Sequence, residues 1–346
     1  MSLLRLLAGN CLLAFFALAA AASAGCGGPT RPGPPGNPPR ISCPVDISIR
    51  AAIGPSQPVS FETPTAQAGT PPVPVTCAPA SGSAFAIGTT PVICTATDAS
   101  AREAMCTFNV TLTGVQIAVT RYLAFGDSVT EGQNGRIAFG LEIVDVPSAY
   151  PTKLQFLLDG AYPNEGIVVS NRGVGGEDIR DGKARLPDVL AQEHPEALLL
   201  LHGYNNLLAD CQNPVTSRCS TQIETVVETL RDMVRIARRA PFSLSYVFVG
   251  TLTPPGPFRG GPRDRRIADD AIMKTNAEIK QKLPGEGATI VDIYPLFLGH
   301  ESEYISPDGL HPDPPGNDAI AGAFFDAIKA AIPQNPLLRL TAAFRH

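Results

Sequence analysis

The feature that most constrains the fold is a change of pattern near residue 120. From there onward, short apolar runs that can form buried strands alternate with loops and amphipathic helical segments. Strands that alternate with helices form parallel sheets, because each helix carries the chain back across one face of the sheet. The sequence therefore predicts a three-layer α/β/α domain over residues 121–335. Its five parallel strands are predicted at Tyr122–Phe125, Ile167–Ser170, Ala197–Leu201, Leu244–Leu252 and Thr289–Ile293.

Residues 221–239 have the clearest helical pattern of this region. Thr221 and Glu224 have the spacing of a capping box, and arginines gather near the opposite, negative end of the helix dipole. Apolar side chains recur on one face, at Ile223, Val226, Val227, Leu230, Met233, Val234 and Ala237. This stripe predicts packing against the sheet rather than a membrane or partner surface. A second helix is predicted from Asn317 to about Ile332.

A serine, a histidine and an aspartate stand where chemistry is expected on this architecture. Ser128 follows the first strand through Gly126-Asp127, and open α/β sheets bind ligands just past the carboxyl ends of their strands. A serine hydroxyl needs an imidazole to take its proton and a carboxylate to orient that imidazole. His311 and Asp308 are three residues apart, so that one turn can present both. We predict a Ser128-His311-Asp308 triad.

The other histidines do not suit the role of base. His202 follows the apolar run Ala197–Leu201 and is expected to be a hydrogen-bonded core residue, while His194, His300 and His346 have no partner motif. The chain also lacks the Gly-x-Ser-x-Gly elbow of the α/β-hydrolases.

Four short blocks occur in the order typical of one family. They are Gly126-Asp127-Ser128, Asn171-Arg172-Gly173, Gly203-Tyr204-Asn205-Asn206, and Asp308 with His311. Over roughly residues 120 to 332, the chain resembles the GDSL, or SGNH, hydrolase family. The resemblance implies a flavodoxin-like fold, an ester-cleaving serine hydrolase, and an oxyanion hole made by the Ser128 N–H, the Gly173 N–H and the Asn205 side chain. Asn206 stands where the family usually has Asp, which we expect to change loop geometry more than chemistry.

Residues 40–114 have a different pattern, in which short strands alternate with Gly/Pro/Ser turns and no helical period intervenes. This pattern predicts a small β-sandwich, joined by a linker at 115–120. Its strands are predicted at Asp46–Arg50, Val73–Thr76, Val92–Ala96 and Cys106–Leu112.

The sequence around the cysteines of this region is typical of an extracellular module. Three segments resemble the HYR (hyalin repeat) module, which implies an immunoglobulin-like sandwich: Cys43-Pro, the run Cys77 to Cys94 followed by Thr-Ala-Thr-Asp98, and Cys106-Thr-Phe-Asn-Val. Cysteine connectivity cannot be read from sequence, but we favour Cys43 with Cys106 and Cys77 with Cys94. The module either binds a surface glycan or protein or only spaces the catalytic domain from the envelope. We favour the spacer.

The amino terminus has the pattern of an export signal. Residues 1–25 contain Arg5, an apolar core and Ala22-Ser23-Ala24, which is typical of a cleaved secretory signal. Ser23-Ala24-Gly25-Cys26 also resembles a bacterial lipobox, so that cleavage after Ala24 competes with lipidation at Cys26. The Pro/Gly-rich stretch at 26–39 suits a tether, and we favour the lipoprotein. Either alternative predicts an exported protein, as a periplasmic or outer-envelope lipoprotein or an extracellular enzyme.

The remaining cysteines predict disulfides rather than a metal site. Cys11 leaves with the signal and Cys26 is set apart, so six are left: Cys43, Cys77, Cys94, Cys106, Cys211 and Cys219. Cys211 and Cys219 are close enough to bridge one loop. The chain has no Cys-x-x-Cys and no His-Glu-x-x-His, and an oxidising compartment favours disulfides. We expect neither a metal nor an organic cofactor.

Three long loops, at 131–149, 210–220 and 254–264, are expected near the carboxyl-end face of the sheet, where they could shape a substrate site. A basic cluster lies in or after the third loop; its members are Arg259, Arg263, Arg265 and Arg266. It could receive an anionic substrate group, but we favour a solvated face beside nearby aspartates. The net charge of −5 and the lack of a basic patch with interleaved aromatics make nucleic acid an improbable partner. Residues 336–346 are expected to be a tail.

The leading hypothesis is an exported or tethered serine esterase that acts on a small-molecule, lipid or acylated-glycan ester. We favour carbohydrate O-acyl esters over lipid or thioester cleavage and acyl transfer to a sugar. The competing hypothesis is a surface adhesion protein whose hydrolase-like domain is inactive. The intact Ser128, Asp308 and His311 argue against it, whereas Asn206 is the one feature in its favour.

Overall fold

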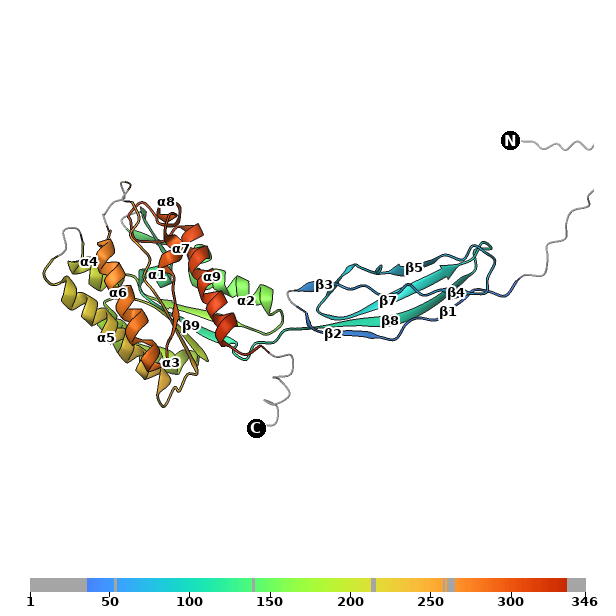
Figure 1. Cartoon of the computed structure of the whole chain (residues 1–346), viewed down its shortest axis with the longest axis horizontal. Helices are drawn as coiled ribbons and strands as arrows, with labels where there is room; N and C mark the ends of the chain where they lie inside the picture. Colours follow the sequence, from blue (N-terminus) through green and yellow to red (C-terminus); the bar gives the residue numbers. More distant parts are fainter. Residues whose placement is uncertain are drawn as a thin grey trace, which may run out of the picture.

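The computed structural model describes residues 36–52, 55–138, 141–212, 216–257, 259 and 265–334. The predicted signal segment, Cys26, most of the tether, Arg263, His346 and the predicted tail lie outside the described residues. The described elements form an all-β amino-terminal module and an α/β domain, which Figure 1 shows as separate bodies. Each has its own cluster of buried apolar side chains, so the chain folds around two cores.

The amino-terminal module is built on a four-stranded sheet. The strand order is β2-β8-β7-β5, in which β2 runs parallel to β8 and the other neighbours are antiparallel. These strands are β2 (Ile47–Ala52), β8 (Glu103–Gly114), β7 (Gly88–Thr97) and β5 (Val75–Ala78). Two small antiparallel pairs complete the module: β1 (Arg40–Ile41) with β4 (Ala66–Gln67), and β3 (Ser56–Pro58) with β6 (Ala84–Ala86). The architecture agrees with the predicted immunoglobulin-like sandwich.

Alternation along the long strands builds a thin core that disulfides reinforce. Val92, Cys94 and Ala96 point inward from β7, and Phe108, Val110 and Leu112 do so from β8. Bonds join Cys43 to Cys106 and Cys77 to Cys94, the pairing favoured from the sequence. Small sandwiches bury little apolar surface, so such cross-links contribute to their stability.

The Asp98 side chain organises the turn between β7 and β8. Its oxygens accept the backbone N–H groups of Thr70, Ser100 and Arg102 and the guanidinium of Arg102. Burial opposes ionisation of this carboxyl, but these donors hold its pKa well below the ordinary value. The last residue of the Thr-Ala-Thr-Asp segment therefore has a structural role.

The α/β domain contains a five-stranded, all-parallel sheet with the strand order β12-β9-β13-β14-β15. Its strands are β9 (Arg121–Gly126), β12 (Val168–Gly173), β13 (Ala197–Leu201), β14 (Tyr246–Gly250) and β15 (Thr289–Val291). Helix α2 packs on α9, whereas α3, α5 and α6 pack side by side, and the sheet lies between the two groups (Figure 1). The three-layer α/β/α prediction is confirmed.

The long helices are α2 (Tyr150–Ala161), α3 (Ile179–Glu193), α5 (Cys219–Arg238), α6 (Asp269–Lys282) and α9 (Pro314–Ala331). Short elements at the two ends of the sheet are α1 (Ser128–Glu131), α4 (Tyr204–Asp210), α7 (Tyr294–Phe297), α8 (Glu301–Tyr304), and the 3₁₀ turns η1 (Val146–Ser148) and η2 (Pro284–Glu286). A hairpin, β10 (Gln133–Ala138) with β11 (Leu141–Val144), follows α1.

Two helices begin closer to the amino terminus than the sequence predicted. The capping box at Thr221 is wrong, because α5 already begins at Cys219, whose N–H is donated to the Thr216 carbonyl at 3.1 Å. Helix α9 begins at Pro314 rather than at Asn317, in agreement with the preference of proline for the first helical turn. The strands also shift at their ends: β12 continues to Gly173, whereas β14 and β15 are shorter than predicted.

The register of the three strands β12, β9 and β13 aligns their carboxyl ends. Gly173 and Leu201 both pair with Gly126, so the loops that follow these strands start at the same level of the sheet. A Cβ at Gly126 would overlap the Leu201 carbonyl oxygen, and one at Gly173 would overlap the backbone of α1. Glycine at both positions lets the three segments approach closely.

Helix α5 is tied to η2 by an ion cluster that offers a stability test. Glu286 accepts Arg231 at 2.7 Å and Arg235 at 2.8 Å, and these two hydrogen bonds lower its pKa from 4.5 to about 2. A carboxyl with a depressed folded-state pKa stabilises the fold above its unfolded pKa and loses this contribution as the pH falls to the folded value. We expect Glu286→Gln to lower the thermal unfolding midpoint at neutral pH, with the gap from wild type closing between pH 4.5 and about 2.

Circular dichroism melts over this pH range would measure the gap. Glu303→Gln is the matched control, because the Glu303 side chain is exposed and its carboxylate lies 3.6 Å from the His300 ring, beyond hydrogen-bond distance. A gap of constant size down to the lowest pH would contradict the assignment.

Candidate active site

Ser128 lies at the start of a short helix above the sheet. It is the first residue of α1, two residues after the end-aligned Gly126, and it is 2% exposed. Asp127 caps this helix by accepting the Val129 N–H at 3.2 Å. The same carboxylate accepts the N–H groups of Gly203 and Tyr204, each at 3.1 Å. Asp127 therefore joins the segment of the serine to the segment that follows β13.

The turn before α9 presents an aspartate and a histidine to the serine. Asp308 Oδ1 accepts the Ser306 hydroxyl at 2.7 Å and the N–H groups of Leu310 and His311 at 3.0 and 3.1 Å. Its Oδ2 lies 2.6 Å from His311 Nδ1, and His311 Nε2 lies 2.9 Å from Ser128 Oγ. The three predicted triad residues are thus joined in one hydrogen-bonded line.

The electrostatics of this line favour one arrangement of protons. Burial opposes ionisation of Asp308, but the hydrogen bonds from His311, Leu310 and Ser306 outweigh it and hold the pKa of this carboxyl below its ordinary value. An ionised Asp308 can only accept, so His311 Nδ1 carries the proton and Nε2 is free to accept one from Ser128. This is the tautomer that a general base requires.

The three predicted oxyanion donors lie on the end-aligned segments, with different local partners. The Ser128 N–H is at the first turn of α1. The Gly173 N–H is donated to Asn171 Oδ1 at 2.9 Å. Asn205 donates one N–H of its amide to the Glu177 carbonyl at 3.1 Å, which leaves a second N–H on the same nitrogen.

The sequence profile of the GDSL-like lipase/acylhydrolase family matches residues 124–319. This chain belongs to that family. It is an ester-hydrolysing enzyme, and a second profile, that of the HYR domain, matches residues 36–112.

Two curated relatives of this GDSL acylhydrolase are esterases. An acetylxylan esterase of Geobacillus stearothermophilus is 23% identical over 217 residues, which cover 60% of this chain and 93% of the relative. An arylesterase of Vibrio mimicus is 26% identical over 216 residues, which cover 61% of this chain and 88% of the relative.

Solved structures also match the hydrolase domain. The hydrolase LAE5 from the metagenome of Lake Arreo has 22% identity and a TM-score of 0.47, over 62% of this chain and 97% of its own. The acetylxylan esterase Axe2 of Geobacillus stearothermophilus has 24% identity and a TM-score of 0.45, over 61% of this chain and 95% of its own.

The departure from the family pattern at Asn206 has a local explanation. Asn206 Oδ1 accepts the Ile179 N–H at 2.9 Å, and its Nδ2 donates to Asp178 Oδ2 at 2.8 Å. Asp178 in turn caps α3 by accepting the Arg180 N–H. An aspartate at 206 would place two carboxylates side by side, whereas the amide of Asn206 supplies the donor that Asp178 accepts. In this GDSL acylhydrolase, Asn206 secures the start of α3.

Sequence reasoning missed two residues that support the third block. His202 is a buried, hydrogen-bonded residue as predicted, but its partner is Glu177, whose carboxylate lies 3.1 Å from His202 Nε2. Glu177 also accepts Arg185 at 2.5 and 2.8 Å. The run Gly-Gly-Glu177 before α3 and Arg185 within it were the available signals, but nothing local connects them to His202.

The basic cluster is the predicted solvated face only in part, because Arg259 and Arg266 are exposed whereas Arg265 is turned inward. Arg265 is largely buried, pairs with Glu142 at 2.5 Å and lies 3.8 Å from Asp308 Oδ2. Arg259 donates to the Ile305 carbonyl at 3.0 Å. Both arginines therefore pack around the turn that carries Asp308, because that turn concentrates carbonyl and carboxylate oxygens. Arg263 lies outside the described residues.

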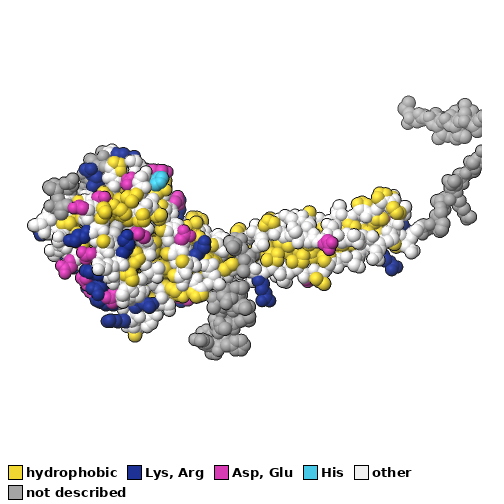
Figure 2. All heavy atoms as spheres, viewed as in Figure 1, with side chains coloured by type: hydrophobic (Ala, Val, Ile, Leu, Met, Phe, Trp, Pro, Cys, Tyr) yellow, Lys and Arg dark blue, Asp and Glu magenta, His cyan; other side chains and the backbone are white. Residues whose placement is uncertain are grey.

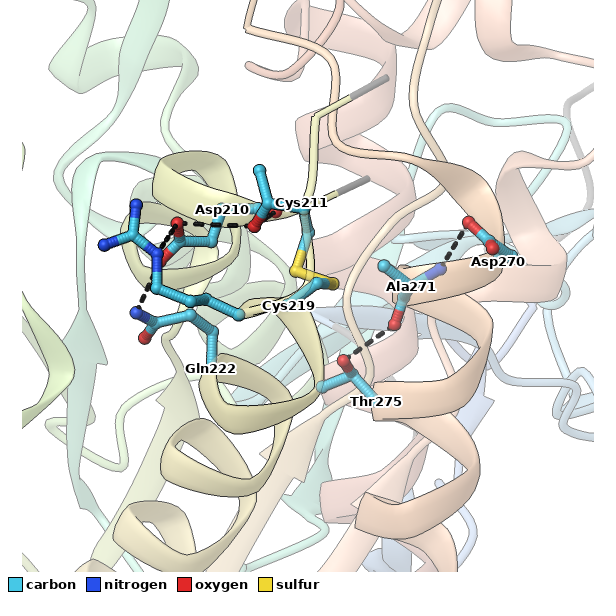
Figure 3. Close-up of a disulfide and its surroundings, with 9 residues drawn as sticks. Asp210, Cys211, Cys219, Gln222, Asp270, Ala271 and Thr275 are labelled. Carbon is cyan, nitrogen blue, oxygen red and sulfur yellow. Dashed lines mark hydrogen bonds and ion pairs between the residues drawn. A yellow bond between two sulfur atoms is a disulfide. The ribbon is translucent and has the colours of Figure 1, made fainter. Parts of the chain in front are cut away.

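The loop after α4 is stapled as predicted by a disulfide between Cys211 and Cys219, eight residues apart (Figure 3). Asp210 accepts Gln222 at 2.8 Å and Arg218 at 3.1 Å, and the Cys211 carbonyl accepts the Ala268 N–H at 2.7 Å. The staple therefore joins α4, α5 and the segment before α6. A cavity of about 320 Å³ lies beside it, lined by Gln212, Pro255, Gly256 and residues 266–269.

The visible surface of the hydrolase domain carries cations and anions intermixed, whereas the HYR domain is mostly uncharged on this side (Figure 2). Within the described ranges, no helix is long and apolar enough to cross a bilayer. No group of three His, Cys, Asp or Glu side chains in the described part of the chain could hold a metal ion.

Proposed function

We propose that this enzyme cleaves carboxylic esters through a Ser128-His311-Asp308 triad and an acyl-enzyme. The observation that carries the proposal is the continuous line from Ser128 Oγ to His311 Nε2, at 2.9 Å, and from His311 Nδ1 to Asp308, at 2.6 Å. These distances lie within the reach that proton transfer between a nucleophile and its base requires.

The reaction divides into two transfers of the acyl group. Ser128 Oγ attacks the ester carbonyl while His311 Nε2 takes the hydroxyl proton, and Asp308 stabilises the imidazolium that forms. His311 then gives this proton to the leaving alkoxide, and the alcohol departs. In the second half, His311 takes a proton from water, the hydroxide attacks the acyl-enzyme, and the acid leaves as Ser128 regains its proton.

Each half passes through an oxyanion that needs fixed donors. We propose that these are the Ser128 N–H, the Gly173 N–H and the second N–H of the Asn205 amide. The end-aligned strands support this set, because they bring the three segments to the same level of the sheet. A developing oxyanion would compete with Asn171 Oδ1 for the Gly173 N–H, and its charge makes it the stronger acceptor.

Asn205 offers the cleanest test of this oxyanion site. Removing one such donor typically costs about 3 kcal/mol of transition-state stabilisation, so we expect Asn205→Ala to lower kcat by about 10²–10³-fold with little change in KM. Steady-state kinetics on p-nitrophenyl acetate measures both constants. Gln281→Ala is the control, because Gln281 carries an exposed amide in the last turn of α6, away from the three strand ends. A kcat within a fewfold of wild type would remove Asn205 from the oxyanion site.

We favour carbohydrate O-acyl esters as the substrate class. The support is the acetylxylan esterase among the curated relatives, together with an accessory HYR domain on the same chain. Acetate release from acetylated xylo-oligosaccharides would be compared with hydrolysis of p-nitrophenyl acetate, butyrate and octanoate. A kcat/KM for the oligosaccharide well above those for the nitrophenyl esters would support this class. A maximum at octanoate would favour a lipase or thioesterase instead, and transfer of acetate to an added sugar would favour an acyltransferase.

A serine-directed fluorophosphonate probe tests the chemistry without any choice of ester. Covalent labelling at Ser128, mapped by peptide mass spectrometry, is the expected result. An unlabelled protein that binds glycans through its HYR domain would favour the adhesion alternative.

We also propose that the protein is exported and tethered to the envelope through a lipid on Cys26. The support is the signal-like sequence of residues 1–25, the lipobox-like Ser23-Ala24-Gly25-Cys26 and the Pro/Gly-rich stretch after it. Palmitate labelling in a bacterial host, beside Cys26→Ser, tests the anchor. Release of the variant into the medium is expected, and equal release of both forms would contradict the anchor.

A further inference from the structure

Four titratable side chains form a row beside the segments of the candidate oxyanion site: Asp127, His202, Glu177 and Arg185. His202 lies between two carboxylates, with Nε2 3.1 Å from Glu177 Oε2 and Nδ1 3.5 Å from Asp127 Oδ2. Arg185 closes the row at Glu177 with two contacts, of 2.5 and 2.8 Å. The side chains of Asp127 and His202 are fully buried and that of Glu177 is 6% exposed. The triad chemistry uses none of these four groups directly.

The two carboxylate residues of this row, Asp127 and Glu177, contact the segments of the candidate nucleophile and oxyanion donors. Asp127 precedes Ser128 and accepts the N–H groups of Gly203 and Tyr204. The Glu177 carbonyl accepts the Asn205 amide. His202, immediately before Gly203, is therefore the link between a carboxylate fixed to the serine and a residue fixed to the oxyanion amide.

The geometry decides the charge of His202. A neutral imidazole has one N–H, so one of its ring nitrogens would turn a lone pair toward a carboxylate oxygen. An imidazolium donates toward both. The Nδ1 atom is buried and has no hydrogen-bond partner among the described residues, and the carboxylate that it faces, 3.5 Å away, is that of Asp127. With His202 charged, two cations face two carboxylates, whereas with a neutral His202 the buried Asp127 would keep its three backbone N–H donors but would have no cation beside it.

The remaining groups near the row do not alter this balance. Tyr150 and Tyr204 are the other titratable residues that act on Asp127, and burial raises the pKa of both phenols, which keeps them neutral. Arg185 lies over the Phe125 ring at 3.9 Å and donates to the Gly126 and Arg172 carbonyls, so it cannot turn toward another acid. Burial disfavours a charged His202, but Asp127 and Glu177 outweigh it and raise the pKa of the imidazole.

We propose that His202 is a permanent imidazolium and a positioning residue, which locks the Gly203–Asn205 segment to the Asp127-Ser128 segment so that the oxyanion donors are fixed before substrate binds. This role rests on the proposed triad function. A misplaced donor stabilises the transition state less, while ground-state binding of the ester changes little.

The charge is tested by NMR on protein with ¹⁵N-labelled histidine, at about pH 8, well above the ordinary histidine pKa of about 6.5. The resonances that disappear in His202→Gln are those of His202, and His300→Gln identifies an exposed reference. Two protonated ring nitrogens at His202 are expected. A neutral tautomer would overturn the proposal. This readout needs no activity, so it is independent of whether the triad assignment holds.

The positioning role is tested by kinetics on p-nitrophenyl acetate. We expect His202→Gln to lower kcat by about 10–100-fold with KM within about twofold, whereas His300→Gln keeps wild-type values. Glu177→Gln alone also lowers kcat. The double variant, His202→Gln with Glu177→Gln, leaves one negative charge, on Asp127, and one positive charge, on Arg185. Its kcat should therefore be no lower than that of His202→Gln. The positioning role would be overturned if the two single losses in kcat multiplied in the double variant. It would also be overturned if His202→Gln lowered Tm but kept the wild-type kcat.

Discussion

Ser128→Ala is expected to lower kcat on p-nitrophenyl esters at least about a thousandfold, with KM and Tm little changed. The substitution removes the hydroxyl oxygen that lies 2.9 Å from His311 Nε2, and with it the nucleophile that would form the acyl-enzyme. Binding and oxyanion stabilisation by the backbone persist, so some catalysis over water remains.

The matched control is Ser302→Ala, because Ser302 is an exposed serine of α8 outside the triad. Single-turnover kinetics with the two variants would distinguish lost chemistry from slow product release. Activity of Ser128→Ala within tenfold of wild type would mean that another group is the nucleophile.

Asp308→Asn is expected to lower kcat by about 10³–10⁴-fold at neutral pH. An amide at this position can turn an N–H toward His311 Nδ1, which then must accept, so that Nε2 carries the proton and cannot act as the base. The substitution also weakens the hydrogen bonds that the Ser306 hydroxyl and the backbone N–H groups of Leu310 and His311 donate to this side chain. The control is Asp326→Asn, a change in α9 away from the turn.

The same variant has a defined signature in stability against pH. The Asp308 pKa is depressed in the folded state, so the ionised carboxyl stabilises the fold above its unfolded pKa of 3.8 and loses this contribution as the pH falls through the folded value. Wild type should therefore melt higher than Asp308→Asn at neutral pH, and the difference should shrink below about pH 4. A difference that grows in acid would contradict an ionised Asp308.

Much of the fold was predictable from local pattern. The five apolar runs became the five parallel strands, because a short apolar run between helical segments has few alternatives to a buried strand. The predicted loop at 131–149 contains the β10–β11 hairpin, and other errors lie at element ends. Helix α5 begins two residues before Thr221, because the turn at Thr216 and the bond from Cys211 to Cys219 extend it. Such constraints come from outside the helix, and no capping pattern contains them.

The candidate site divides in the same way. Ser128, Asn205, Asp308 and His311 were predictable because each lies just past a strand or in a short turn, and the aligned carboxyl ends of parallel strands bring the adjoining loops together. The burial of Arg265 beside Asp308 and the contact of His202 with Glu177 were not predictable from the sequence. Asp308 lies far from Glu142 along the chain, and the partner of Arg265 depends on how the β10–β11 hairpin folds back.

By itself, then, the sequence determined the two domains, the order of the strands along the chain, the segments of the candidate site and the cysteines available for cross-links. These properties reside in local periodicity and spacing, which the chain carries before it folds. Only the tertiary structure decided that Asn206 serves Asp178, that Arg265 faces the Asp308 turn and that His202 joins two carboxylates. The reason is physical: the charge and orientation of a buried side chain depend on the groups that surround it in space, and residues as far apart as Ser128 and His311, 183 positions along the chain, become neighbours only when the sheet forms.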